Sequence, residues 1–278
     1  MPRLSAAIVI AFALAVAAGI AGFQAGGAPS AYAKVNAGAA VLAIAIAAIM
    51  QRLPVSPASL IALCACPLIA AATLVISPDI DGVQHWLPLG PIRLHAAALL
   101  GPAFAIALQA RDDRVGIAAC VVMAAVLFLQ PDLGTSIALV GAAALSLVAS
   151  RSPGRITILA IAVAGCALTA TRPDSLQPVS FVEGVLQDLA QQGPALIIIA
   201  ASALLAAILA PSLRAHDRNT GGLAASGWYL GLLVASLAGN YPTPLIGYGA
   251  APIIGYGIAI GLLGRGRQSP GPVRRNAI

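Results

Sequence analysis

Charged residues are scarce in this sequence. Only 9% of its 278 residues are Asp, Glu, Lys or Arg, whereas 60% are hydrophobic. A water-soluble domain carries about 25% charged residues, so this composition excludes an ordinary soluble fold. Aromatic residues are also few, at 4%, and they are not interleaved with runs of Lys or Arg. We therefore expect no nucleic-acid partner.

Cysteines are few as well, and sequence motifs for known catalytic or metal sites are absent. All four cysteines (Cys64, Cys66, Cys120 and Cys166) fall inside apolar runs. The spacing of Cys64 and Cys66 is not that of a metal site, so we interpret the cysteines as small buried hydrophobic residues. The sequence contains no phosphate-binding loop, hydrolase elbow or zinc motif.

The sequence is instead rich in long apolar runs. They do not alternate between polar and apolar residues, which excludes a membrane β-barrel. Each run can cross a bilayer as a helix, because a helix satisfies its own backbone hydrogen bonds. We predict an all-α, polytopic integral membrane protein with about ten transmembrane helices, several of them short and therefore tilted. The expected helices are Leu4–Phe23, Val35–Met50, Leu60–Ile76, Ile92–Leu108, Val115–Leu129, Leu133–Val148, Ile156–Thr169, Pro194–Leu209, Gly222–Leu237 and Ala251–Leu263.

The distribution of Lys and Arg predicts the orientation of these helices. With the amino terminus in the cytoplasm, 12 of these 15 residues fall on the inner side, and only Lys34, Arg93 and Arg172 fall outside. Because cytoplasmic loops are enriched in Lys and Arg, we predict that the amino and carboxyl termini are both cytoplasmic. Residues 1–264 then form a single transmembrane domain, and residues 265–278 form a basic cytoplasmic tail near membrane lipid.

The first apolar run has two interpretations. It follows Arg3, and Ala31-Tyr32-Ala33 downstream has the small residues of a signal-peptidase site. A cleaved signal peptide is therefore one interpretation. We favour a retained first helix, because the apolar run is longer than a signal peptide needs.

Most of the remaining polar chemistry falls in four segments predicted at the outer face. These segments are Ser77–Gly90, Gln130–Ser136, Arg172–Gly193 and Gly239–Tyr256. The last is rich in Gly, Pro and Tyr, and irregular backbone near membrane depth is tolerated only where protein buries it or where it lines a wet cavity. We expect it to form part of a cavity wall.

The acidic residues of these segments each have a structural and a functional interpretation. Asp132 follows Pro131, and it can cap a helix that begins at Leu133, with Gly134 tightening the turn. A carboxylate at membrane depth is also a functional candidate. Glu183 is either a solvated loop acid or a functional residue, and Asp188 does not share one helix face with it.

The aromatic and histidine residues of the first segment have a structural interpretation too. Trp86 is interpreted as an interfacial anchor, and His85 is interpreted as a surface histidine rather than a ligand. The stretch Phe181–Gly193 predicts an amphipathic or re-entrant helix that leads into the next span.

Three motifs resemble those of the SEDS family (shape, elongation, division and sporulation proteins, the FtsW/RodA group) and follow one another along the chain in the family's order. Gln130-Pro131-Asp132-Leu133-Gly134-Thr135 matches the family signature Gln-Pro-Asp-Leu-Gly-Thr in full. The segment from Gly82 to Gly90, which contains Trp86, is similar to the family's Gly-x-x-x-Trp-Ile-x-Leu-Gly. The segment from Pro244 to Gly249, which ends in Tyr248-Gly249, is similar to Pro-Leu-Val-Ser-Tyr-Gly-Gly. The signature region covers residues 79–264.

The resemblance implies a ten-helix protein of bacterial cell-wall synthesis, with roles in cell shape or cell division. Family members are peptidoglycan glycosyltransferases of the bacterial inner (cytoplasmic) membrane. They polymerise lipid II, an undecaprenyl-linked precursor, at the outer face. A transpeptidase-type penicillin-binding protein is the expected partner, and a divalent cation (Mg or Mn) is the expected cofactor, with ligands that the sequence leaves unknown.

The resemblance also assigns roles to single residues. Glu183 stands where the family has its favoured catalytic Asp, so it is the candidate general base, and Asp188 is the second choice. Trp86, Gln130, Pro131, Asp132, Gly134, Tyr248 and Gly249 are expected to line or shape the substrate cavity.

The sequence departs from the family pattern at several positions. The family's Gln-Pro-Ser-Glu-Leu-x-Lys corresponds here to residues 95–101, so that His95 replaces Gln, Ala98 replaces Glu and Gly101 replaces Lys. An intramembrane charge pair is therefore lost. The His-Thr motif that precedes the catalytic Asp is missing as well. Two alternatives stay open: a non-catalytic relative that binds a partner or a precursor, and a flippase or transporter of lipid-linked precursors.

Overall fold

The computed structural model describes residues 6–53, 56, 59–90, 92–172, 176–213 and 221–264. The basic tail predicted at residues 265–278 lies outside these residues, as does Asp174 in the predicted outer segment Arg172–Gly193.

Helices dominate the described part of the chain, which also contains one two-stranded β-hairpin. The elements are α1 (Ala6–Ala25), α2 (Ser30–Met50), α3 (Leu60–Ile76), β1 (Trp86–Leu89), β2 (Ile92–His95), α4 (Ala96–Ala110), α5 (Arg114–Leu129), α6 (Leu133–Ala149), α7 (Pro153–Ala170), α8 (Val185–Gln192), α9 (Pro194–Leu213), α10 (Gly222–Ala238) and α11 (Ala250–Leu263).

The prediction of about ten apolar helices is confirmed. Helices α1, α2, α7 and α9 are long and apolar enough to cross a membrane by themselves. Six further apolar helices, α3, α4, α5, α6, α10 and α11, are 14 to 17 residues long. Short spans require tilt or a locally thinner bilayer, as the sequence predicted. The chain is a multi-pass membrane protein, and the cytoplasmic location of its termini stays a prediction.

Two expected helices are shorter in the structure, because a strand or a loop replaces their first residues. The run Ile92–Leu108 begins as strand β2, which pairs antiparallel with β1 so that Trp86 lies opposite His95. Helix α4 starts only at Ala96, because His95 adopts an extended conformation and its side chain caps the helix. The expected helix over Phe181–Gly193 is also shorter: Phe181 to Gly184 form a loop, and only α8 is helical.

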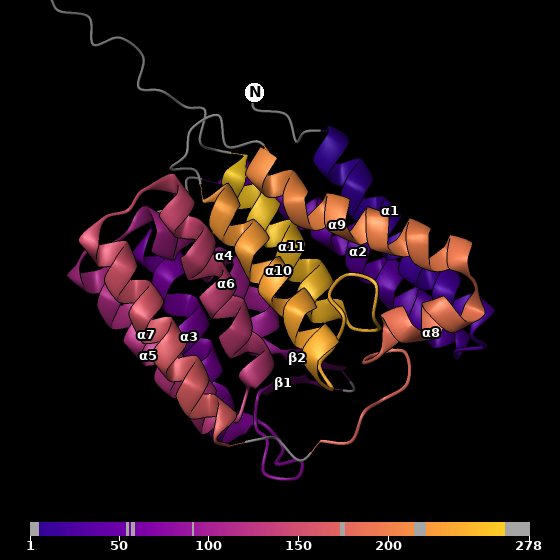
Figure 1. Cartoon of the computed structure of the whole chain (residues 1–278), viewed down its shortest axis with the longest axis horizontal. Coiled ribbons are helices and arrows are strands. Elements are labelled where there is room, and N and C mark those ends of the chain that lie inside the picture. The colour runs from indigo at the N-terminus through magenta and orange to yellow at the C-terminus, as the bar shows by residue number, and fades with distance from the viewer. Residues whose placement is uncertain are drawn as a thin grey trace, which may run out of the picture.

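The helices pack in two groups around α10 and α11 (Figure 1). Helix α10 packs against α6, α9 and α4, whereas α11 packs against α2 and α4. Helix α1 packs against α9 and α2, and the ring of Phe12 stacks on Tyr256 with centroids 4.9 Å apart. The first apolar run is thus packed into the bundle as helix α1.

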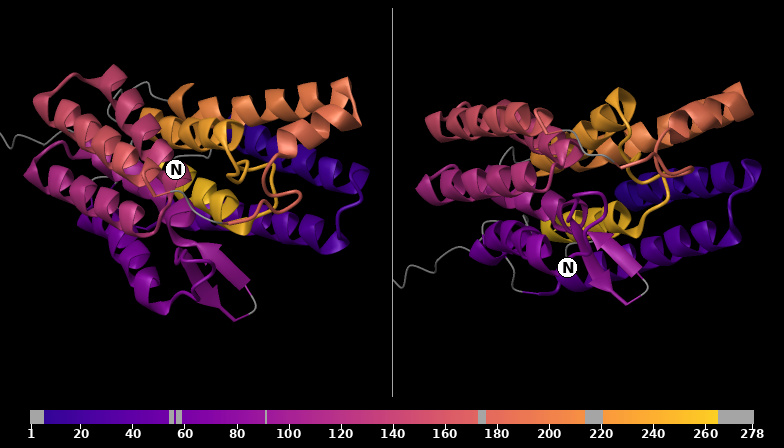
Figure 2. Two further views of the ribbon diagram at one scale, coloured as in Figure 1. Left: turned by 60° about the horizontal axis from the view of Figure 1, so that its bottom comes forward. Right: turned by 90° about the horizontal axis from the view of Figure 1, so that it is seen from below.

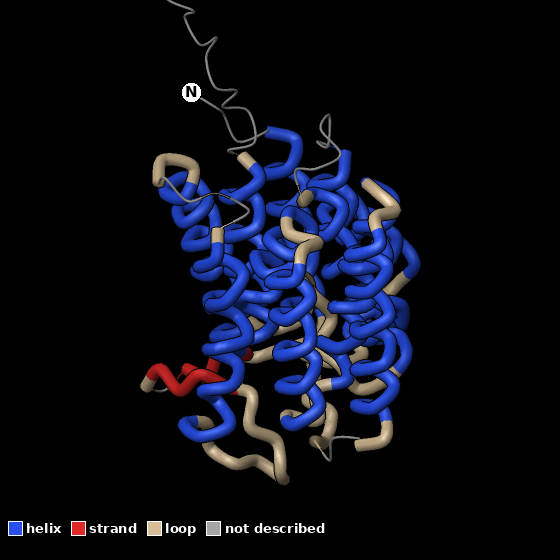
Figure 3. Tube along the Cα trace, turned by 90° about the vertical axis from the view of Figure 1, so that its left-hand side faces the viewer, coloured by secondary structure: helices blue, strands red, loops and turns tan. Residues whose placement is uncertain are grey.

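The loops that carry most of the polar residues meet at one end of the bundle. The hairpin β1–β2 projects from the helices at this end (Figure 2). The helices run along a common direction and the hairpin crosses them at the side (Figure 3). Helix α8 lies at the same end and buries Val185 and Leu189 beneath it.

Candidate functional site

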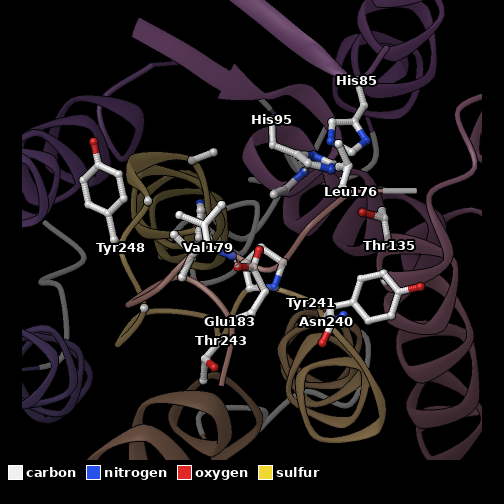
Figure 4. A pocket seen from close by; sticks show the side chains of 18 of the residues that line it. His85, His95, Thr135, Leu176, Val179, Glu183, Asn240, Tyr241, Thr243 and Tyr248 are labelled. Carbon is white, nitrogen blue, oxygen red and sulfur yellow. Dashed lines mark hydrogen bonds between the residues drawn. The ribbon is translucent and has the colours of Figure 1, made fainter. Parts of the chain in front are cut away.

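A cavity of about 540 Å³ opens at this end of the bundle. Six residues of the sequence prediction line it: Trp86, Asp132, Gly134, Glu183, Tyr248 and Gly249. They come from all four polar segments, which are far apart in the sequence. In Figure 4, His85 and His95 lie at one side of the pocket and Tyr248 lies at the opposite side, with Glu183 between them. The segment Asn240–Pro244 contributes further wall, as expected for irregular backbone at this depth.

Gln130 attaches the turn between α5 and α6 to helix α3. This side chain is buried, and its Nε2 donates hydrogen bonds to Ala70 O and Thr73 Oγ1 of α3, both at 2.7 Å. The Thr73 hydroxyl lies 3.0 Å from the carbonyl oxygen of Gln84. Gln130 thus connects the turn to the residue before His85. It does not line the cavity but holds two of its walls together.

Asp132 caps α6, as the sequence predicted. Its Oδ1 accepts a hydrogen bond from Thr135 N at 2.9 Å. Its Oδ2 faces His95 Nε2 at 3.1 Å, so the carboxylate has a second role beyond the cap. Gly134 is required beside it, because a Cβ there would lie 2.8 Å from the ring of Tyr241.

His85 is buried, which contradicts its interpretation as a surface histidine. It is 7% exposed, and its ring packs edge-on against Trp86 and 4.2 Å from the ring of His95. The hairpin explains the error, because its register brings two residues that are ten apart in the sequence side by side.

Burial and the neighbouring charges set the protonation of this cluster. Burial, with a further contribution from His95, lowers the pKa of His85 to about 3, so this ring is neutral at pH 7. Burial alone would raise the pKa of Asp132. The nearby His95, which also hydrogen-bonds to this carboxylate, and the hydrogen bond from Thr135 outweigh it and lower this pKa below its ordinary range. Asp132 is therefore an anion within reach of two imidazole rings.

Glu183 lies on a strained loop. Its Oε2 accepts a hydrogen bond from Val179 N at 2.6 Å, which closes a tight turn. Phe181 in this turn has φ +68°, a conformation that is uncommon for a residue with a side chain. The loop is tied to the opposite wall by Thr243 N donating to Val182 O and Tyr248 N donating to Phe181 O. These bonds fix the backbone of the two residues that precede Glu183.

The wall that carries Tyr248 and Gly249 is held by Asn36 of α2. This side chain is fully buried, donates to Gly247 O at 2.9 Å and accepts from Gly249 N at 3.2 Å. The ring of Tyr248 stacks on Tyr32, with centroids 3.8 Å apart. An irregular segment is thereby positioned by two residues of a regular helix.

Comparison with solved structures identifies proteins that share this fold. Two solved structures of the rod shape determining protein RodA from Thermus thermophilus, one of a single-residue variant, resemble the chain with TM-scores of 0.69 and 0.70. Both comparisons cover 94% of this chain and 97% of RodA at 21% sequence identity. The chain has the RodA fold.

A further solved structure shares this fold at lower similarity. It comes from work on the coordination of polymerization and crosslinking by a peptidoglycan synthase complex, and its TM-score is 0.64 at 19% identity. The comparison covers 93% of this chain and 96% of that chain. No protein-family model matches the sequence, and no curated protein matches it significantly. The resemblance inferred from the motifs is confirmed at the level of the fold.

Not every expected site residue reaches the cavity of this RodA fold. Asp188 lies on α8 and is outside the cavity lining, so Glu183 is the better-placed of the two acids. Pro131 is buried in the turn before Asp132. It contributes to the shape of this turn and does not line the cavity. Conversely, His85, His95 and Asn36 were not anticipated. The short runs on either side of Gly90-Pro91 are a hairpin signal that could have found the two histidines.

The position where the family carries a Lys is filled differently here. A Cβ built on Gly101 of α4 would lie 1.9 Å from Cζ2 of Trp228 on α10. Trp228 is fully buried, and its Nε1 has no hydrogen-bond partner among the residues that the structure describes. The indole therefore occupies the space in which a longer side chain at residue 101 would have to lie.

Proposed function

We propose that this chain is a SEDS-type protein of bacterial cell-wall synthesis that acts in the cytoplasmic membrane on a lipid-linked precursor such as lipid II. The observation that carries the proposal is the shared cavity: Trp86, Asp132, Glu183 and Tyr248 belong to four distant segments and line one space. The RodA fold and the full match to the Gln-Pro-Asp-Leu-Gly-Thr signature support it.

The reaction that fits this cavity is transfer of a glycan to the hydroxyl of an acceptor sugar. Glu183 is the candidate general base, because it lines the cavity and backbone hydrogen bonds tie the residues before it to the opposite wall. It would take the proton of the attacking hydroxyl as the bond to the diphosphate leaving group breaks. A divalent cation would neutralise charge on that diphosphate. Glu183 lines the cavity, and its carboxylate offers oxygen ligands of the kind that Mg and Mn prefer.

The general base is tested with the purified full-length protein and lipid II. Proton transfer by a positioned side chain contributes about 10²- to 10⁴-fold to a rate. We therefore expect Glu183→Gln to polymerise lipid II at least about 100-fold more slowly than the wild type. Asp188→Asn is the matched comparison, because it changes an acid of the same segment outside the cavity. Polymerisation by Glu183→Gln at the wild-type rate would exclude this role.

The departures from the family pattern in α4 favour a second function. The loss of the family's Glu and Lys, together with the indole of Trp228 beside Gly101, fits a relative that binds the precursor or a partner without catalysis. This candidate predicts that the wild-type protein binds lipid II and yields no glycan. Glycan formation by the purified chain would exclude it.

The proposed partner is a transpeptidase-type penicillin-binding protein, because a similar structure belongs to a peptidoglycan synthase complex. The test is co-purification of the native complex from bacterial membranes. The polymerisation assay is then repeated with that partner present, so that an activity which requires the complex is detected.

A further inference from the structure

We propose that His85, His95 and Asp132 bind a transition-metal dication, and that zinc is the ion this site prefers. The three residues come from the segment before β1, the end of β2 and the cap of α6. One ligand atom of each lies within 4.8 Å of one ligand atom of both others. The inference stands on this cluster and does not depend on the reaction proposed above.

The distances are close to those of a metal site. A tetrahedral zinc site holds imidazole nitrogens and carboxylate oxygens about 2.0–2.2 Å from the ion, which places the ligand atoms about 3.3 Å apart. His95 Nε2 and Asp132 Oδ2 are already 3.1 Å apart. The longest remaining separation exceeds the ideal by about 1.5 Å. Binding therefore requires the His85 ring to move toward the other two ligands.

An unsatisfied polar atom points to a missing ligand. His85 is 7% exposed, and its Nδ1 is buried without a hydrogen-bond partner among the described residues. Such groups are rare in folded proteins and are commonly satisfied by a bound ion or water. A cation held between this nitrogen and the anionic Asp132 would satisfy both.

The donor set distinguishes among metals. Two imidazoles and one carboxylate suit zinc and other late transition metals, whereas Mg prefers oxygen ligands. This cluster therefore does not fit the Mg expected from the family resemblance, and it fits Mn less well than zinc. The family pattern has Gln where this chain has His95, so the site would be a property of this chain.

The surroundings leave room for a substrate on the ion. All three residues line the 540 Å³ cavity, so a substrate in that cavity would lie beside the ion. Three protein ligands with an open position are the pattern of catalytic rather than structural zinc sites. The ligand at that position would be water or an anionic oxygen, such as that of a phosphate or carboxylate.

Binding at His95 requires one rearrangement. Nδ1 of His95 accepts a hydrogen bond from Ala98 N at 3.1 Å, so the neutral ring carries its proton on Nε2, which lies 3.1 Å from Asp132 Oδ2. For Nε2 to bind the ion, this proton leaves Nε2 and a proton is taken up at Nδ1. Ala98 N then loses its cap acceptor.

The test is metal titration of the full-length protein in detergent after treatment with a chelator. We expect calorimetry to show one zinc per chain, and Co²⁺ to give a visible spectrum without the thiolate band of a cysteine site. Mg at a thousandfold excess should not displace zinc. Three variants each remove one ligand and keep its structural contact. His85→Phe keeps the ring against Trp86, His95→Asn keeps an acceptor for Ala98 N, and Asp132→Asn keeps one for Thr135 N.

Each of these variants should weaken zinc binding at least about 100-fold, because loss of a supporting residue alone weakens metal sites by about 10- to 100-fold. Asp81→Asn is the matched control: it changes another acid of the same cavity and should bind as the wild type does. Thermal unfolding without metal shows whether each variant is folded. The proposal is overturned if folded His85→Phe and Asp132→Asn bind zinc like the wild type, or if the wild type binds none. Neither result bears on the Glu183→Gln assay.

Discussion

Asn36 shows how much of the site depends on single residues away from it. It is fully buried on α2, and its amide bonds both Gly247 O and Gly249 N. We expect Asn36→Leu, which has a similar size, to lower the free energy of unfolding by about 2–4 kcal/mol, because a carbonyl and an amide lose their buried partner. Equilibrium unfolding in mixed micelles measures it. Val41→Ala on the same helix is 70% exposed and should stay within about 0.5 kcal/mol. Equal effects of the two changes would contradict this role.

The close contact between Gly101 and Trp228 leads to a second prediction about single residues. We expect Gly101→Ala to destabilise the protein by about 1–3 kcal/mol, because the new Cβ overlaps the indole 1.9 Å away. Trp228→Phe removes the overlapping atoms, so the double variant should be more stable than the sum of the single effects predicts. A double-mutant cycle on unfolding free energies measures this coupling. Strict additivity would show that the two residues do not compete for the same space.

At the residue scale, the sequence predicted the site residues that lie within recognisable motifs. Trp86, Asp132, Gly134, Tyr248 and Gly249 were predicted from short patterns, and all line the cavity. His85, His95 and Asn36 were missed for a physical reason. Their roles come from pairing across a hairpin and from a contact between residues more than 200 positions apart, and no local pattern encodes such contacts.

At the element scale, apolar run length predicted helices well and strands poorly. The bounds of α3 match the expectation at both ends, because its apolar run is limited by polar residues. The run from Ile92 was read as one helix, since its strand and helix portions are equally apolar. Hydrophobicity alone does not distinguish a short strand from the first turn of a helix.

The pair α6–α10 carries a prediction about helix packing. A Cβ at Gly227 would lie 2.3 Å from Gly141 O, so the two backbones are in direct contact. Close approach through small residues is typical of membrane helix pairs. We expect Gly227→Ala to lower the unfolding free energy by about 2 kcal/mol or more, because the helices must separate.

Gly38 of α2 is the matched control for that change. A Cβ there meets nothing within 4 Å. Gly38→Ala should therefore be neutral or stabilise the protein by up to about 1 kcal/mol, through helix propensity alone. Thermal and denaturant unfolding of both variants in the same detergent gives the comparison. If the two alanines had the same effect, the close contact between α6 and α10 would not matter for stability.

At the scale of the whole molecule, the cavity has functional meaning only if it faces the correct side of the membrane. The placement of Lys and Arg predicts that the end with the cavity faces outward. A precursor that is polymerised outside the cell must reach its enzyme from that side. Orientation is therefore the property on which the proposed function depends most.

Cysteine labelling tests this orientation. In a variant whose four native cysteines are alanine, Gln177→Cys places a thiol on an exposed residue of the cavity lining. Ser150→Cys places one on an exposed residue between α6 and α7, at the predicted inner face. We expect a membrane-impermeant maleimide to label residue 177 in spheroplasts and residue 150 only in inverted vesicles. The opposite pattern would place the cavity in the cytoplasm, where the polymerisation proposed for Glu183 could not take place on an outward-facing precursor.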